Sequence, residues 1–331
     1  MTTKILFSSH GLGDIANDEI QNILQKYHLG ALIKANKTKN GAMKQTMFVT
    51  STEGVFVIKG NPVYKGQLEE EGFFISELGK RTNLSLPLPY KIDSSLEIFP
   101  YPYAIMPLLP GFHFLHIDNY TIEEKKEITT ALVNALKEMH SWKVSIYGEW
   151  NPITKSLQPF EQSFDQWLHN RVTYWLKDAE KYSTITNEDW DWTSNFLNET
   201  LPYLSSLTRP TFVMGDFKPG NCLIDKNDDG WYVSGVFDFT NSYFGDPVAD
   251  LIKFLTIFID SNELGVAKHF IQSFYDDRED PYAFKQRLKL HMLQQRVLDW
   301  GCAKAMNMVD WEEDISFKAW ITKYMNIIDK L

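Results

Sequence analysis

The chain has only two cysteines, Cys222 and Cys302, among 331 residues. Two such distant cysteines provide neither a disulfide framework nor a pair at metal-ligand spacing. No run of about 18 apolar residues is present, which excludes an ordinary membrane-spanning helix. Residues 1–7 hold one lysine and a very short apolar run, which is not the pattern of a signal peptide. We therefore expect a cytoplasmic protein with no membrane partner.

An excess of basic residues is also missing. The chain has 43 Asp and Glu against 33 Lys and Arg, a net charge of −10. Binding to nucleic acid needs clustered Lys and Arg on phosphates, so we expect no nucleic-acid partner. The net negative charge is compatible with attracting a cationic small molecule, and solubility alone would also explain it.

The length of the chain suits two lobes rather than one compact core. Strand-like residues 47–50 and 55–58 flank a turn at 51–54 and predict a hairpin. A helical pattern follows at 67–80, and the proline-punctuated apolar stretch 101–111 is typical of a connector between lobes.

Helical patterns dominate beyond that connector. Thr121 and Glu124 form a capping box at the start of one helix. Further helices are predicted near 164–178, 189–204 and 248–259 and on to the C-terminus, around a short β segment at 211–239. We predict an α+β fold with a β-rich N-terminal lobe, residues 1–106, and a larger helical C-terminal lobe, residues 107–331. No internal repeat is visible, and no obligate protein partner is evident.

The β segment gathers the polar residues that can carry chemistry. If its hairpin turns at Asp229–Gly230, Asn221 lies opposite Asp238 at the open end, and Asp216 precedes Asn221 by five residues. Two carboxylates and an amide oxygen are hard ligands of the kind that hold Mg²⁺. A carboxylate beside a hydroxyl can also accept its proton. Each aspartate alone could simply end a strand or cap a turn, but the joint spacing favours a reaction site.

The same residues carry a family resemblance. Gly-Asp-(four residues)-Asn at 215–221, Asp238, and Gly-Asp-Pro at 245–247 resemble motifs of the aminoglycoside phosphotransferase and choline kinase superfamily, which has a protein-kinase-like fold. The resemblance implies that Asp216 is the catalytic base and that Asn221 and Asp238 bind Mg²⁺. Asp246 and Asp250 match the family's Gly-Asp-Pro segment, and we expect them to brace the catalytic loop and start a helix.

Two positions in the loop depart from the family's pattern. Met214 replaces the family's motif histidine, which mainly braces the loop, so the reacting groups are intact and the rigidity of the loop is in question. Lys218 follows Asp216 by two residues, as in the protein-kinase form of this loop, where such a lysine meets the γ-phosphate. A solvated loop lysine is the alternative.

The nucleotide side of the site is expected in the first third of the chain. Kinase folds of this type place a strand lysine on the α- and β-phosphates and pair it with a helix glutamate. Lys59 ends an apolar strand, and Glu71 on the next helix is the expected partner, with Glu70 as the alternative. Gly41 lies where a phosphate-covering loop belongs, although a simple turn would also explain it.

The connector would meet the adenine edge of ATP. Pro107 has no N–H, so Met106 and Leu108 are the expected donors, unless this run only packs. No Walker sequence is present, so the chain is not a P-loop enzyme.

These features together predict an ATP- and Mg²⁺-dependent kinase that phosphorylates a hydroxyl of a small molecule. Acidic runs at 276–280 and 310–314 suggest an aminoglycoside-like or otherwise cationic acceptor, and hence antibiotic resistance, unless they are solvated helix ends. A metabolic kinase of choline, homoserine or a sugar is the first alternative. A non-catalytic binding protein of the same fold is the second.

Overall fold

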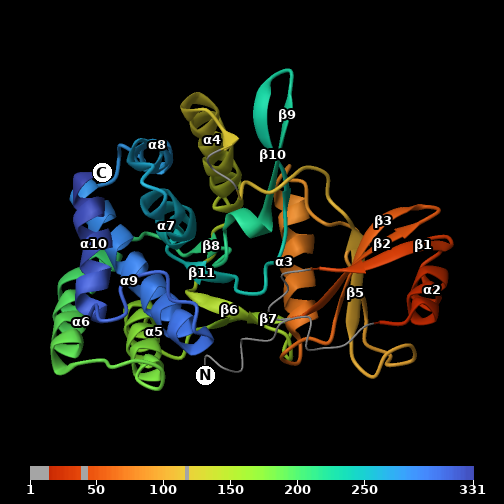
Figure 1. Ribbon diagram of the computed structural model, residues 1–331, viewed down its shortest axis with the longest axis horizontal. Coiled ribbons are helices and arrows are strands. Elements are labelled where there is room, and N and C mark those ends of the chain that lie inside the picture. The colour runs from red at the N-terminus through yellow and green to blue at the C-terminus, as the bar shows by residue number, and fades with distance from the viewer. Residues whose placement is uncertain (1–14, 39–43, 116–118) are drawn as a thin grey trace.

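The computed structural model describes residues 15–38, 44–115 and 119–331. A β-rich part and a larger helical part lie side by side (Figure 1). The α+β, two-lobed architecture expected from the sequence is therefore confirmed. The boundary at residues 106 and 107 stays a prediction; the fifth strand ends at Pro107.

The N-terminal lobe is built on an antiparallel five-stranded sheet of order β1-β2-β3-β5-β4. The predicted hairpin is confirmed, because Ser51 lies opposite Gly54 across a two-residue turn. The strands are β1 (Leu32–Lys37), β2 (Gln45–Ser51), β3 (Gly54–Gly60), β4 (Lys91–Asp93) and β5 (Tyr103–Pro107).

Two helices cover opposite faces of this sheet. α2 (Asn17–Lys26), which the sequence analysis did not predict, buries Ile20 against Met47 and Ile58 on one face. α3 (Gln67–Arg81), predicted at 67–80, packs Leu68 against Val57 on the other face. α3 thereby lies on the face of the sheet that carries the side chain of Lys59, two residues after Val57.

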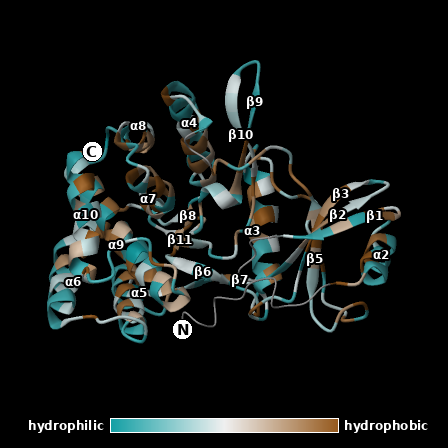
Figure 2. Ribbon diagram, viewed as in Figure 1, coloured by the Kyte–Doolittle hydropathy of each residue, from teal (hydrophilic) through white to brown (hydrophobic). Residues whose placement is uncertain are grey.

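The C-terminal lobe is mainly helical, and its helices pack around one large apolar core. Figure 2 shows both hydrophobic and hydrophilic stretches on the outer helices, as expected where one face is buried. The predicted capping box of Thr121 and Glu124 starts α4. The helices are α4 (Ile122–Met139), α5 (Phe164–Ala179), α6 (Asn187–Thr200), α7 (Ile252–Asp260), α8 (Leu264–Phe274), α9 (Pro281–Met306) and α10 (Phe317–Lys330). Within the described ranges, every helix is too short or too polar to cross a lipid bilayer.

Short β-structure in this lobe positions the catalytic segment. A four-stranded sheet has the order β7-β6-β11-β8, and a separate hairpin joins β9 to β10. Short 3₁₀ helices η3 (Leu201–Ser206), η4 (Pro219–Asn221) and η5 (Pro247–Leu251) lie between these elements. The strands are β6 (Gly148–Asn151), β7 (Ser156–Pro159), β8 (Thr211–Val213), β9 (Cys222–Asn227), β10 (Gly230–Val236) and β11 (Tyr243–Gly245).

The β9–β10 hairpin has a different register from the expected one. Asn227 pairs with Gly230, so the turn lies one residue earlier than Asp229–Gly230. The Asn227 side chain accepts a hydrogen bond from the Asp229 amide at 2.9 Å, which fixes the turn there. A bulge near Ser234 then shifts the register, and Phe237 donates its amide to the Asn221 carbonyl. Asn221 therefore lies opposite Phe237, and Asp238 is one residue beyond the open end.

Candidate active site

Lys59 and Glu71 form the ion pair that the sequence predicts. Lys59 Nζ contacts Glu71 Oε1, and Glu71 is fully buried. Glu70, the alternative partner, instead accepts a hydrogen bond from the Tyr64 hydroxyl at 3.0 Å. One helical position separates the two glutamates, which turns them to different sides of α3.

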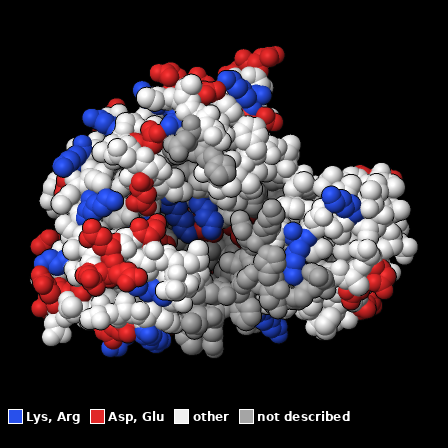
Figure 3. Space-filling model, viewed as in Figure 1, with Lys and Arg blue, Asp and Glu red and all other residues white. Residues whose placement is uncertain are grey.

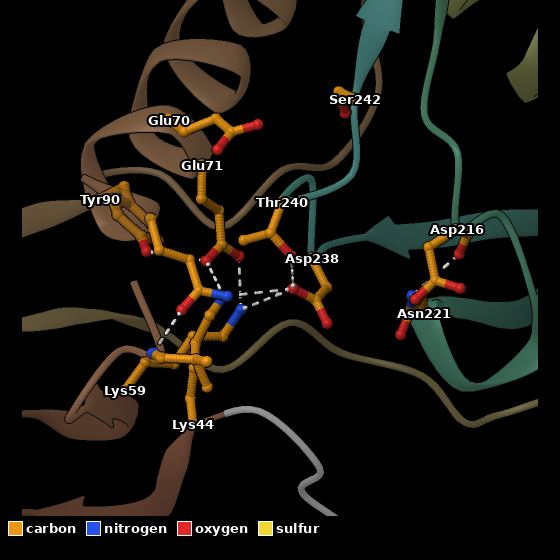
Figure 4. Close-up of polar contacts among 12 residues, drawn as sticks. Lys44, Lys59, Glu70, Glu71, Tyr90, Asp216, Asn221, Asp238, Thr240 and Ser242 are labelled. Atoms are coloured by element: carbon orange, nitrogen blue, oxygen red, sulfur yellow. Dashed lines mark hydrogen bonds and ion pairs between the residues drawn. The ribbon is translucent and has the colours of Figure 1, made fainter. Parts of the chain in front are cut away.

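A second lysine, Lys44, shares this carboxylate (Figure 4). Its Nζ lies 2.8 Å from Glu71 Oε2 and 3.3 Å from Asp238 Oδ1. The Tyr90 hydroxyl also donates to Glu71 Oε2, at 3.0 Å. Lys59 Nζ lies 3.9 Å from the same Asp238 oxygen. Two ammonium groups and two carboxylates thus form one compact cluster between the lobes.

The cluster favours the charged forms of Lys44, Glu71 and Asp238. Burial opposes the charged form of Lys44, but Glu71 and Asp238 outweigh it and raise the pKa of Lys44. Burial also opposes ionisation of Glu71 and Asp238, and the nearby lysines nevertheless lower the pKa of both carboxyls. Asp238 adopts a left-handed backbone with φ of 70°, which turns the chain sharply after β10.

The catalytic loop holds Asp216, Asn221 and two lysines together. Asn221 Nδ2 donates to Asp216 Oδ2 at 2.8 Å and to the Asp216 carbonyl at 2.9 Å. Lys218 Nζ lies 2.9 Å from Asp216 Oδ2, and Lys253 from α7 contacts Asp216 Oδ1. Burial lowers the pKa of Lys253, but Asp216 outweighs it and the pKa is raised overall. Figure 4 shows Asp216 and Asn221 together, apart from the lysine cluster at Asp238.

Backbone hydrogen bonds brace this loop where the family has its histidine. Asp250 accepts the amides of Met214 and Gly215, each at 2.8 Å, and His140 Nε2 lies 3.0 Å from Asp250 Oδ2. The Met214 side chain is fully buried in the core. Gly215 has φ of +73°, and a Cβ there would lie 2.3 Å from the Asn241 carbonyl oxygen, so only glycine fits. The loop is therefore braced through the backbone amides of Met214 and Gly215.

Asp246 braces the next segment. It caps η5 by accepting the Val248 amide at 3.1 Å, and its carboxylate binds Arg287 at 2.6 Å and His291 at 2.9 Å. Burial opposes ionisation, but Arg287 and His291 lower the pKa of Asp246 to about 2. Asp246 and Asp250 therefore have structural contacts of the kind that the resemblance implies.

A cavity of about 220 Å³ lies beside the two lysines that contact Asp216. Lys218 and Lys253, which both contact Asp216, form part of its wall. Asp299 in the same wall accepts hydrogen bonds from Gln295 Nε2 at 2.8 Å and from Arg296 Nη1 at 3.1 Å. Figure 3 shows Lys and Arg side chains gathered in the hollow between the lobes on the face drawn. The cavity is lined by Lys218, Lys253, Thr256, Gln295 and Asp299.

The expected adenine donors need correction. The Leu108 amide donates to the Val55 carbonyl at 3.0 Å, so it already has a partner within the sheet. Met106, two residues before Leu108, lies opposite Val57 in the same antiparallel ladder, so the Met106 amide also points to β3. The backbone carbonyl of Pro107 points to the opposite edge of β5, where β4 pairs only with residues 103–105. Gly41, expected over the phosphates, lies outside the described residues.

The oxygen donors at the site fit a hard cation. Because Asn221 Nδ2 is directed at Asp216, the side-chain oxygen Asn221 Oδ1 is available for a metal. The Asp238 side chain is 37% exposed and already attracts two ammonium groups. Among the described residues, no group of three His, Cys, Asp or Glu forms a metal cage. A cage is not needed, because Mg²⁺ is usually held by one or two carboxylates together with substrate phosphates.

Two of these site residues were missed in the sequence. Lys44 could have been found, since the confirmed hairpin places residue 46 opposite Lys59, and residue 44 directly precedes β2. Lys253 gave no signal, because it lies on an apolar helix and meets Asp216 only through tertiary packing.

Comparisons with known proteins identify the family. The sequence pattern of the phosphotransferase enzyme family matches residues 36–283, and the chain belongs to that family. It is therefore a small-molecule phosphotransferase. No curated protein sequence matches the chain.

Solved structures share its fold at low identity. One is a thermostable mutant of aminoglycoside phosphotransferase APH(4)-Ia in a ternary complex with AMP-PNP and hygromycin B. It is 15% identical, with a TM-score of 0.61, over 94% of this chain and 98% of that one. Another is the GDP complex of aminoglycoside 2'-phosphotransferase-IIIa, 12% identical, with a TM-score of 0.63, over 93% of this chain and 95% of that one.

Proposed function

We propose that the chain transfers the γ-phosphoryl group of ATP to a hydroxyl of a small polar molecule, with Mg²⁺ as cofactor. The observation that carries this proposal is that the chain holds two charged clusters, one around Glu71 and Asp238 and the other around Asp216. Lys44, Lys59, Glu71 and Asp238 suit a nucleotide's phosphates. Lys218 and Lys253, which contact Asp216, line a cavity of small-molecule size. Structural relatives in complex with AMP-PNP or GDP are consistent with a nucleotide in the first cluster.

In the proposed reaction, Asp216 orients the acceptor hydroxyl and accepts its proton. The hydroxyl oxygen forms a bond to the γ-phosphorus while the bond from that phosphorus to the β–γ bridging oxygen breaks, and ADP leaves. Lys59 and Lys218 stabilise the negative charge on the phosphates. Mg²⁺, held by Asn221 and Asp238, would neutralise further phosphate charge when bound. The Pro107 carbonyl, at the uncovered strand edge, would accept a hydrogen bond from the adenine amino group.

The acceptor would occupy the cavity beside the two lysines that contact Asp216. A cationic, aminoglycoside-like acceptor stays a prediction, and relatives in complex with hygromycin B and kanamycin support it. The acidic run 276–280 does not add support, because Asp276 pairs with Arg278, Glu279 with Arg287, and Asp280 caps α9.

A metabolic kinase of a small hydroxyl compound is the second candidate. The cavity of about 220 Å³ suits a single ring or a short chain, and two of its five lining residues are lysines. A neutral sugar, zwitterionic homoserine or cationic choline would be compatible with that size.

The test is Mg²⁺-dependent ADP release from ATP, with GTP in a parallel arm. Aminoglycosides, macrolides, choline, homoserine and simple sugars are offered as acceptors, and Asp216→Asn is the control. Release that one acceptor class stimulates and the control abolishes is the expected result. Absence of release with every acceptor, together with absence of Mg²⁺·ATP binding, would favour the non-catalytic binding protein instead.

A further inference from the structure

The register of the N-terminal sheet places two lysines on one face. Thr46 on β2 lies opposite Lys59 on β3. Lys44 directly precedes β2, and its ammonium group contacts Glu71, the partner of Lys59, so both lysines reach the face of the sheet that α3 covers. Lys44 and Lys59 are thus within reach of one another's partners.

Both lysines converge on the same buried carboxylate. Lys59 contacts Glu71 Oε1, and Lys44 lies 2.8 Å from Glu71 Oε2. Both ammonium groups also approach Asp238 Oδ1, at 3.3 Å for Lys44 and 3.9 Å for Lys59. The Glu71 carboxylate therefore positions two cations in the same way, one with each oxygen (Figure 4).

A purely structural role accounts poorly for the second lysine. Lys59 alone would neutralise Glu71, and the Tyr90 hydroxyl already satisfies Oε2. Lys44 is only 6% exposed, and burying a second ammonium group is costly unless anionic groups pair with it. Asp238 is its other anion, and that carboxylate is the one expected to bind Mg²⁺. A metal on Asp238 would leave the cluster with an excess of positive charge, which the phosphates of ATP would balance.

We propose that Lys44 is a second phosphate-binding lysine, which acts beside Lys59 on the phosphates of bound ATP. This inference rests on the proposed function, because it takes a nucleoside triphosphate as the ligand. It assigns to the residue directly before β2 a role that the sequence analysis gave to Lys59 on β3 alone. It also predicts that the two lysines partly substitute for each other, since the same carboxylate orients both.

The test is equilibrium binding of Mg²⁺·ATP, Mg²⁺·ADP and adenosine to the full chain by titration calorimetry. The variants are Lys44→Met, Lys44→Arg, Lys59→Met and the double variant with both methionines. Lys34→Met is the matched control, because Lys34 is an exposed lysine on the neighbouring strand β1. Thermal unfolding of each variant is recorded in parallel.

Loss of one charge-assisted phosphate contact weakens binding by about tenfold to a hundredfold. We expect that loss for Lys44→Met with Mg²⁺·ATP, with adenosine binding unchanged and most of the affinity restored in Lys44→Arg. The double variant should bind Mg²⁺·ATP no better than adenosine, and Lys34→Met should match the wild type.

Two results would overturn the inference alone. One is wild-type affinity for Mg²⁺·ATP in Lys44→Met. The other is an equal loss of ATP and adenosine binding with a lower unfolding temperature, which would make Lys44 a structural residue. A wild-type chain that binds adenosine but shows no added affinity for Mg²⁺·ATP would overturn the proposed function, and the inference with it.

Discussion

The side chain of Asp250 accepts the backbone amide of Met214 at 2.8 Å, although 36 positions separate the two residues. This contact braces the loop at Met214, the position where the sequence analysis left the rigidity of the loop in question. Because the bond reaches the backbone, it is independent of the side chain at 214. It fixes the loop that carries Asp216.

Replacing Asp250 should therefore loosen the catalytic loop. The Met214 and Gly215 amides donate to different oxygens of Asp250, and in Asp250→Asn one of these oxygens becomes an NH₂ group, which cannot accept. The variant also loses the charge that faces His140. We expect turnover to fall about a hundredfold, since small misplacements of reacting groups cost that much. Asp228→Asn, at the hairpin turn, is the control and should turn over like the wild type; equal turnover in both variants would contradict the bracing role.

Restoring the family's histidine should bring no gain. Met214 is fully buried in the apolar core, so Met214→His places an imidazole there in exchange for a thioether. We expect the free energy of unfolding to fall by about 2 kcal/mol. Turnover should stay at or below that of the wild type. Denaturant titration and steady-state kinetics measure the two effects, and faster turnover would show that the loop does need the histidine.

Glu71 and Glu70 give a matched pair of substitutions on one helix. Glu71→Gln removes the charge between Lys44 and Lys59, and we expect the free energy of unfolding to fall by about 3 kcal/mol. Mg²⁺·ATP binding should weaken as well, because both lysines lose the group that orients them. Glu70→Gln should leave nucleotide binding unchanged. Similar nucleotide affinities in the two variants would contradict the assignment of Glu71.

Glu70 should also make stability depend on pH. Burial raises the pKa of Glu70 to about 7 in the folded chain, helped by the Glu149 carboxylate and opposed by the Tyr64 hydroxyl. The folded state then binds this proton more tightly than the unfolded state does. Its stabilising contribution is present at low pH and is lost as the pH rises from the unfolded pKa, near 4.5, through about 7.

The measurement is the unfolding temperature of wild type and Glu70→Gln between pH 5 and pH 8. Glutamine is neutral throughout, so we expect the variant to gain stability relative to the wild type as the pH rises. A constant difference across this range would show that Glu70 does not titrate there.

The sequence was sufficient for much of the fold because its local signals agree with the tertiary structure. The turn at 51–54, the capping box at Thr121 and the helix at 67–80 each have short-range causes, and each is present. The Lys59–Glu71 pair followed from the resemblance to a kinase fold together with strand-then-helix order, and it is also present.

The remainder depends on long-range packing. The β9–β10 register differs because a side-chain hydrogen bond at Asn227 and a bulge near Ser234 act together. Leu108 was expected to be a free donor, but the sheet extends far enough to use its amide. Lys253 reaches Asp216 from α7, 37 positions along the chain, and no local pattern could indicate that contact.

The most direct test of the account follows the γ-phosphate itself. ATP labelled at the γ-phosphorus is incubated with Mg²⁺, the acceptor that stimulates ADP release, and either the wild type or Asp216→Asn. The account predicts that the label appears on the acceptor as a phosphate ester with the wild type and stays on ATP with the variant. Label recovered only as inorganic phosphate, or equal transfer by the variant, would contradict the assignment of Asp216 as the base in a hydroxyl phosphotransferase.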